Sequence, residues 1–270
     1  MQKILILGDG FIGSNLNRYF TKKYDTTILS KSILDVTYNK FDFDFSDFTT
    51  VIYAVGMKNV KECENHFYKC FDINSNGVSN VIKHLPKITK FIYISTDYVF
   101  DGTQSMYSEL CNAKPATVYG YSKLLGEFLT KKHSNHIIVR TSGVYGKNCV
   151  WLNNLLHDLD KGQDINCYSD IYNSPTYVVN LSEMIDDLLE MNFAGTINLC
   201  GRDRCNRYEL YSKVAEVFGK NRKLLHQDKS DGTFPKDVSL SHSLYSVRAK
   251  KTPNNISIGS RFLFPVLLLR

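Results

Sequence analysis

The stretch Lys3-Ile4-Leu5-Ile6-Leu7 near the N-terminus is a short apolar run, and Gly8-Asp9-Gly10-Phe11-Ile12-Gly13 follows it directly. The run predicts a buried strand, and the amphipathic pattern from Phe11 to Lys23 predicts a helix that begins within the glycine segment. A GxGxxG segment between a strand and a helix allows a tight turn and lets backbone N–H groups at the helix N-terminus approach a pyrophosphate. We therefore expect a dinucleotide to contact the following residues: Gly8, Gly10, Phe11, Ile12 and Gly13.

Short apolar runs alternate with helix-length amphipathic segments through the first two thirds of the chain. This alternation predicts an α/β fold, a Rossmann-type doubly wound parallel sheet with a smaller C-terminal substrate-binding lobe. The expected domains are an NAD(P)-binding domain, 1–145, completed by part of 172–200, and a region that is mainly the substrate-binding lobe, 146–270. The expected strands are Lys3–Leu7, Thr26–Leu29, Thr50–Val55, Lys90–Ser95, His136–Thr141 and Gly195–Cys200. The expected helices are Phe11–Lys23, Glu62–Leu85, Val118–Lys132, Val150–Lys161, Leu181–Glu190 and Arg207–Phe218.

The composition is that of an ordinary globular protein, with 43% hydrophobic and 22% charged residues among 270. The net charge of +6 is spread thinly and no run of five basic residues occurs, so we expect no nucleic-acid partner. The longest apolar run, Phe262–Leu269, contains Pro265 and is much shorter than the roughly 20 residues of a membrane helix. The sequence therefore predicts a cytoplasmic protein with no membrane partner.

The cysteines and histidines give no metal-binding pattern. Seven cysteines include no CxxC pair, and seven histidines include no HExxH motif. No cluster of the two residue types has the spacing of a zinc site. We expect reduced thiols and no bound metal.

Ser30-Lys31-Ser32 follows the second expected strand, where an NAD-specific site would carry Asp or Glu for the adenosine ribose. A lysine between two hydroxyls suits a 2′-phosphate. The segment therefore favours NADPH as the cofactor, with Ser30 and Lys31 as contacts and NADH as the alternative. A solvated loop lysine is the other interpretation of Lys31.

Tyr119 and Lys123 are four positions apart in an expected helix, so they lie on one face of it. A phenol exchanges protons poorly near neutral pH, and an ammonium one turn away lowers its pKa. Thr96, which follows the strand Lys90–Ser95, supplies a hydroxyl that can hold a substrate carbonyl against the tyrosine. Combined with the glycine segment in this order, the three residues form the strongest functional pattern in the chain.

These motifs resemble the extended short-chain dehydrogenase/reductases, and within that family the dTDP-4-dehydrorhamnose reductase branch. The resemblance implies an oxidoreductase that uses NAD(P)H to reduce a nucleotide-linked 4-keto-6-deoxy sugar in polysaccharide precursor synthesis. It also implies that Thr96, Tyr119 and Lys123 form the catalytic triad. The segments that carry it, within about the first 240 residues, are Gly8–Gly13, Leu34–Thr37, Ala54–Gly56, Ser95–Gly102, Tyr119–Glu127, Arg140–Gly146, Ser174–Thr176 and Arg207–Glu209.

The same resemblance assigns binding residues. The remaining cofactor contacts it implies are Asp35 and Val36 near the adenine, then Ala54, Val55, Gly56 and Ser95, together with Tyr119 and Lys123. The substrate contacts it implies are Thr96, Asp97, Tyr98, Gly143 and Tyr145.

The chain departs from the family pattern at three places. Gly143 stands where a tryptophan usually lies against the sugar, which predicts a wider pocket there. Phe234-Pro235 replaces an Arg-Pro pair that would contact a diphosphate, and Lys236 is the available substitute. The family's magnesium-linked dimer carboxylates have no counterpart that can be placed.

Two other functions keep the same fold. One is a non-catalytic NADP-binding regulatory subunit, for which the apolar segment Phe262–Leu269 would be a docking element. The other is a sugar-nucleotide epimerase or dehydratase, which needs a further acid–base pair that the sequence does not supply. Asn74 remains open between a relay to Lys123 and local backbone hydrogen bonding. A homodimer is also left open, as are the nucleotide base and the sugar.

Overall fold

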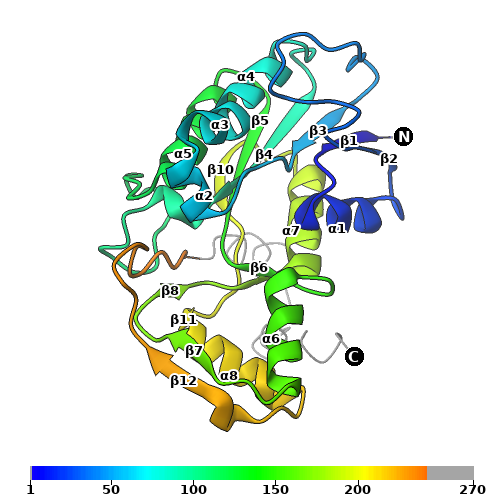
Figure 1. Cartoon of the computed structure of the whole chain (residues 1–270). Helices are drawn as coiled ribbons and strands as arrows, with labels where there is room; N and C mark the ends of the chain where they lie inside the picture. The colour runs from blue at the N-terminus through cyan, green and yellow to red at the C-terminus, as the bar shows by residue number, and fades with distance from the viewer. Residues whose placement is uncertain (1, 242–270) are drawn as a thin grey trace, which may run out of the picture.

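The computed structural model describes residues 2–241 and contains a six-stranded parallel sheet at its centre (Figure 1). The strand order is β10-β5-β4-β3-β1-β2, and each neighbouring pair is parallel. The fold class expected from the sequence is therefore confirmed. The strands are β1 (Lys3–Leu7), β2 (Asp25–Leu29), β3 (Thr50–Tyr53), β4 (Lys90–Thr96), β5 (His136–Thr141) and β10 (Gly195–Asn198).

Helices cover both faces of this sheet, which is why its strands are apolar runs without a polar face. Along β1, Ile4 and Ile6 pack in one cluster with α1 and α7, whereas Leu5 and Leu7 pack in another with α4. The first face is covered by α1 (Phe11–Phe20) and α7 (Val178–Glu190). The second is covered by the π-helical turn η1 (Asp72–Asn76), α4 (Gly77–Ile82) and α5 (Val118–Thr130). The short helices α2 (Val60–Asn65) and α3 (Phe67–Phe71) pack against α5.

The winding of the sheet reverses at β1, which lies between β2 and β3. In a doubly wound sheet, this reversal opens a crevice at the carboxyl ends of the strands. The chain continues from β3, through β4 and β5, to one edge, and then leaves the sheet after Thr141. It returns with α7 and β10, which pack on the sheet after an excursion through the lobe.

The lobe lies below the sheet in Figure 1 and has its own apolar cluster. Leu152 and Leu155 of one helix pack with Val214 and Ala215 of another and with Leu225. Its helices and strands are β6 (Val144–Tyr145), α6 (Val150–Asp160), β7 (Ile165–Tyr168), β8 (Tyr172–Asn173), β9 (Thr176–Tyr177), β11 (Cys205–Asn206), α8 (Arg207–Val217), η3 (Arg222–Leu224) and β12 (Leu225–Asp228).

Each strand expected from the sequence is present with small shifts of its ends. The helix expected over Glu62–Leu85 is instead divided into α2, α3, η1 and α4, because the backbone leaves the helical region at His66 and widens to a π-turn at Asp72–Asn76. The short lobe strands had no sequence pattern, since two to four residues are too few to display a period. Phe262–Leu269 lies outside the described residues. Among residues 2–241, no helix combines the length and the apolar character needed to span a membrane.

Candidate active site

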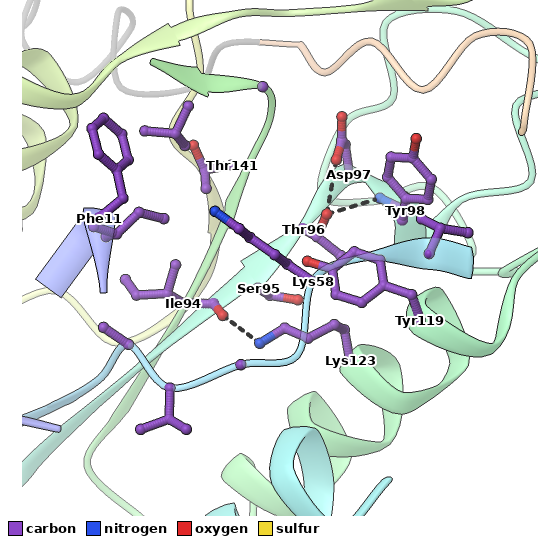
Figure 2. Close-up of a pocket in the computed structure, with 17 residues that line it drawn as sticks. Phe11, Lys58, Ile94, Ser95, Thr96, Asp97, Tyr98, Tyr119, Lys123 and Thr141 are labelled. Atoms are coloured by element: carbon purple, nitrogen blue, oxygen red, sulfur yellow. Dashed lines mark hydrogen bonds between the residues drawn. The ribbon is translucent and has the colours of Figure 1, made fainter. Parts of the chain in front are cut away.

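A cavity of about 300 Å³ lies at the carboxyl ends of β3, β4 and β5 (Figure 2). It brings together the start of α1, the loop after β3, the end of β4, α5 and the loop after β5. These segments are far apart in the sequence and meet because parallel strands end at the same edge of the sheet. The lining residues are Phe11, Ile12, Ala54, Val55, Gly56, Lys58, Val60, Ile94, Ser95, Thr96, Asp97, Tyr98, Tyr119, Lys123, Thr141, Gly143 and Val144.

A second cavity of about 320 Å³ extends from the glycine segment to the end of β2. It shares Ala54, Val55 and Gly56 with the first cavity. Its lining residues are Gly8, Asp9, Gly10, Lys31, Leu34, Asp35, Val36, Ala54, Val55, Gly56, Met57 and Ile73. The two cavities together follow the sheet edge from β2 to β5.

The glycine segment leaves space and donors for an anionic group. A Cβ on Gly13 would lie 1.9 Å from the carbonyl oxygen of Gly8, so only glycine permits this close approach of α1 to the turn. A Cβ on Gly10 would meet nothing within 4 Å, and the N-terminus of α1 has no side-chain cap. Uncapped N–H groups beside open space fit the pyrophosphate of a dinucleotide.

At the far end of the second cavity, Lys31 forms an ion pair with Asp35 at 3.4 Å. The Ser30 hydroxyl forms a hydrogen bond with that of Ser32, and Ser30 does not line the cavity. Burial pushes the pKa of Asp35 up, but hydrogen bonds from Thr37 and the charge of Lys31 outweigh it and lower the pKa. A 2′-phosphate would therefore have to share Lys31 with a carboxylate. The sequence interpretation of Lys31, as a phosphate contact or a solvated lysine, did not include this ion pair.

Thr96, Tyr119 and Lys123 meet in the first cavity, as Figure 2 shows. Burial is the main cause of the pKa shifts of the last two: it raises the pKa of Tyr119, against a hydrogen bond with Thr96, and lowers that of Lys123 to about 7. The Lys123 ammonium donates to the Ile94 carbonyl oxygen at 2.7 Å and lies 4.0 Å from the ring centre of Tyr93. The expected lowering of the Tyr119 pKa by Lys123 is therefore absent from this structure.

Asp97 borders the cavity, but its carboxylate points away from it (Figure 2). Oδ1 accepts a hydrogen bond from Thr96 at 2.8 Å, and Oδ2 accepts one from Ser142 at 2.5 Å. The expected direct contact of Asp97 with substrate does not fit this geometry. Tyr98 does line the cavity, and its ring packs edge-on against that of Tyr119 at 5.7 Å.

The loop after β5 differs from expectation at two residues. Gly143 has φ +48, and a Cβ there would point at the Asn173 amide, 3.1 Å away. The side-chain direction is therefore occupied by Asn173 and Pro175 rather than open, which argues against a pocket widened by a missing indole. Tyr145 is buried in the lobe cluster beside Trp151 and does not line the cavity. Its ring is part of the lobe core, so the first cavity does not bring Tyr145 together with the other predicted substrate contacts.

Asn74 connects the loop after β3, at Met57, to Ser122 of α5. Its side chain exchanges two hydrogen bonds with the backbone of Met57 and donates to the Ser122 hydroxyl at 2.9 Å. Its location within a π-helical turn turns this amide toward the loop. These bonds explain its burial as backbone support, and the Lys123 ammonium bonds to the Ile94 carbonyl oxygen rather than to this amide.

One cavity-lining residue and two side chains outside the cavities differ from what the sequence indicated. Lys58 is exposed and extends over the cavity from the loop after β3 (Figure 2). Ser142 has a role only because Asp97 faces it across the sheet edge. The proposed substitute for a diphosphate contact, Lys236, instead binds Asp170 at 2.5 Å and the Ser230 hydroxyl at 3.1 Å. Loop side chains of this kind depend on tertiary placement, so no local pattern marks them.

Comparison with known proteins shows which family this chain resembles in sequence. Residues 1–252 match the model described as the RmlD substrate binding domain. A spore coat polysaccharide biosynthesis protein of Bacillus subtilis is 29% identical over 236 residues, 83% of this chain and 82% of the relative. A dTDP-4-dehydrorhamnose reductase of Aggregatibacter actinomycetemcomitans is 31% identical over 211 residues, 72% of this chain and 70% of the relative.

A solved structure gives the same result for the fold. The dTDP-4-dehydrorhamnose reductase of Bacillus anthracis in complex with NADP superposes with a TM-score of 0.84 at 25% identity, covering 92% of this chain and 93% of that one. The family model spans both the sheet and the lobe, and it includes the glycine segment and the residues Thr96, Tyr119 and Lys123 that line the cavities. The resemblance drawn from those motifs is confirmed, and the chain belongs to the RmlD substrate binding domain family.

Proposed function

We propose that this protein is an NADPH-dependent reductase of a nucleotide-linked 4-keto-6-deoxy sugar, with NADH as a weaker alternative cofactor. The observation that carries the proposal is the meeting of Thr96, Tyr119 and Lys123 in a cavity that shares a wall with the glycine-segment cavity. The relatives named as dTDP-4-dehydrorhamnose reductases support the same reaction class.

The residues of the second cavity would hold the cofactor. Gly8, Gly10 and the first N–H groups of α1 would bind its pyrophosphate, and Lys31 would reach the adenosine end. When bound, NADPH supplies a hydride to the carbonyl carbon of the substrate. Ser95 and Lys123, at the floor of the first cavity, would lie at the nicotinamide end.

Tyr119 would donate its proton to the carbonyl oxygen as that oxygen gains negative charge. Burial keeps the phenol protonated in the unliganded protein, because its pKa is raised. Lys123, with a pKa lowered to about 7, can hold a proton near neutral pH and stabilise the phenolate that remains. Displacing its bond to the Ile94 carbonyl by a ligand hydroxyl would free the ammonium for this task.

The same site favours reduction over the alternative reactions. An epimerase or dehydratase of this fold needs a further acid–base pair facing the sugar. Among the lining residues of the first cavity, the acidic side chain is Asp97, and both of its oxygens are bonded to Thr96 and Ser142. A regulatory subunit would have no need for the buried arrangement of Tyr119 and Lys123.

We also propose the expected division of labour between domains. Residues 1–145, with part of 172–200, would bind the cofactor, and 146–270 would mainly bind substrate. The packing of α7 and β10 on the sheet supports the assignment of the 172–200 region to the first domain. Cytoplasmic action and a homodimer belong to the same set of expectations, and sedimentation of the purified protein tests the dimer.

A direct assay tests the function. Purified protein is mixed with NADPH and each member of a panel of nucleotide-linked 4-keto-6-deoxy sugars, and NADPH absorbance is followed. We expect turnover with at least one member and tight NADPH binding measured by titration. NADPH binding without turnover of any member would support the regulatory alternative and contradict the reductase.

A further inference from the structure

The hydroxyl of Thr96 has its single proton committed. Thr96 Oγ1 donates to Asp97 Oδ1 at 2.8 Å and accepts from the backbone N–H of Tyr98 at 3.3 Å (Figure 2). A hydroxyl has one proton to donate. While that proton points to Asp97, Thr96 can only accept from its other neighbour, the Tyr119 hydroxyl, and it cannot donate a hydrogen bond to a substrate oxygen.

The other side of Asp97 is fixed equally firmly. Ser142 Oγ donates to Asp97 Oδ2 at 2.5 Å and accepts from the backbone N–H of Ser174 at 3.1 Å. Asp97, Ser142 and Ser174 are buried. In this arrangement Oδ2 accepts from Ser142, so a proton added at Oδ1 is the one that would change the bond to Thr96.

The surroundings of Asp97 favour proton uptake in mildly acidic solution. Burial raises its pKa to about 6, although the hydrogen bonds from Ser142 and Thr96 act in the opposite direction. The titratable groups that face it are Tyr98 from its own turn, Tyr119 from α5 and Cys200 beyond β10, and its charge raises the pKa of each. Lys58 and Lys123 line the same cavity.

We propose that Asp97 is a positioning residue that decides whether Thr96 accepts or donates a hydrogen bond at the substrate carbonyl. As a carboxylate, Asp97 holds the Thr96 proton away from the cavity. As a carboxylic acid, Oδ1–H donates to Thr96 Oγ1, and Thr96 passes its own proton toward the carbonyl oxygen, while Oδ2 still accepts from Ser142. The switch takes up one proton from solvent, which forms the Oδ1–H bond, and the Thr96 hydroxyl rotates toward the cavity with its own O–H bond intact.

The consequence follows from the charge that develops during reduction. Hydride addition places negative charge on the carbonyl oxygen, and a second donor beside Tyr119 stabilises it. The protonated form of Asp97 is therefore the faster form. This inference rests on the proposed reductase function and adds to it the residue that orients Thr96.

Asp97→Asn reproduces the protonated form at every pH. The asparagine Nδ2 can donate to Thr96 while its oxygen accepts from Ser142, which matches the two bonds of the carboxylic acid. We expect kcat/KM of the wild type for the sugar to rise at least about tenfold as the pH falls through the Asp97 step, since one oxyanion donor is worth on the order of 100-fold. Asp97→Asn should lack this step and stay near the low-pH rate.

A second variant keeps the inference testable if Asp97→Asn does not fold. Ser142→Ala removes a donor that stabilises the carboxylate, so the step should move to higher pH. Asp101→Asn is the matched control: this carboxylate accepts from the Tyr107 and Thr103 hydroxyls on the same loop but does not line the cavity, and its profile should follow the wild type. NADPH titration of each variant checks that it is folded.

The outcomes separate the inference from the function on which it depends. If Asp97→Asn keeps the wild-type pH step in kcat/KM, or if Ser142→Ala leaves the pH of that step unchanged, the role of Asp97 is overturned and the reductase function stands. A loss of rate in Asp97→Asn at all pH values with the step retained would show a merely structural role. A wild type that turns over no panel member would overturn both proposals.

Discussion

Asp97 in the sheet half and Asp170 in the lobe are held in opposite ways. In the sheet half, Asp97 is buried against neutral hydroxyls, and burial raises its pKa to about 6. In the lobe, Asp170 binds the ammonium of Lys236, and this bond is the main cause that lowers its pKa to about 2. The difference shows what surroundings do to the same side chain: burial raises the pKa of Asp97 to about 6, whereas the ion pair keeps Asp170 charged well below neutral pH.

Removing the buried hydroxyl of Tyr119 should have the largest effect on turnover if the sheet half performs the chemistry. Tyr119→Phe removes the proton donor and retains the ring, so kcat should fall by about 100-fold or more while NADPH affinity stays unchanged. Tyr121→Phe is the matched control, because this tyrosine is exposed on the same helix and does not line the cavity. Equal rates in the wild type and Tyr119→Phe would exclude Tyr119 as the donor.

The opposite pKa shifts of Asp97 and Asp170 predict opposite pH dependences of the free energy of unfolding. The folded protein binds the Asp97 proton more tightly than the unfolded chain does, so this group makes stability fall as the pH rises from about 4 to about 6. The shift from 3.8 to about 6 corresponds to about 2 to 3 kcal/mol. Asp97→Asn should lose this dependence in urea unfolding at a series of pH values. An unchanged dependence would place its source elsewhere.

The preference for NADPH over NADH tests the role of Lys31 at the edge of the sheet half. Its ion pair with Asp35 is exposed, like that of Lys236 with Asp170 in the lobe. Lys31→Ala should weaken NADPH binding by about 3- to 10-fold and leave NADH binding unchanged, since one exposed charge-assisted contact is worth about 1 kcal/mol. Asp35→Asn should act in the opposite sense by releasing Lys31. Equal losses for both cofactors in Lys31→Ala would show that Lys31 does not contact the 2′-phosphate.

Breaking the ion pair between Lys236 and Asp170 in the lobe should have the smallest effect on stability. The folded state holds the Asp170 proton less tightly than the unfolded chain, so its stabilisation is present above about pH 4 and is lost as the pH falls toward 2. Lys236 is 56% exposed, so solvent screening limits the pair to less than about 1 kcal/mol. Asp170→Asn should therefore shift the urea midpoint slightly at pH 7 and not at all near pH 2. A shift as large as that of Asp97→Asn would erase the contrast between the halves.

The sequence by itself determined the six strands of the sheet and most of their helices. Buried parallel strands are apolar runs, and surface helices repeat every 3.6 residues, so both are visible locally. It also determined the glycine turn and the positions of Thr96, Tyr119 and Lys123, because strand ends and helix spacing place such residues at one edge. These motif residues line the two cavities as expected.

Only the tertiary structure decided how these residues are charged and bonded. Lys123 faces the Ile94 carbonyl, Asp97 faces Ser142, and Tyr145 turns into the lobe core. The partners in each case come from different parts of the fold, and neither a hydrogen-bond direction nor a burial penalty is encoded by local spacing. Desolvation depends on everything packed around a group, which is why the pKa values of Tyr119 and Lys123 were decided by the assembled cavity rather than by their spacing of four positions in one helix.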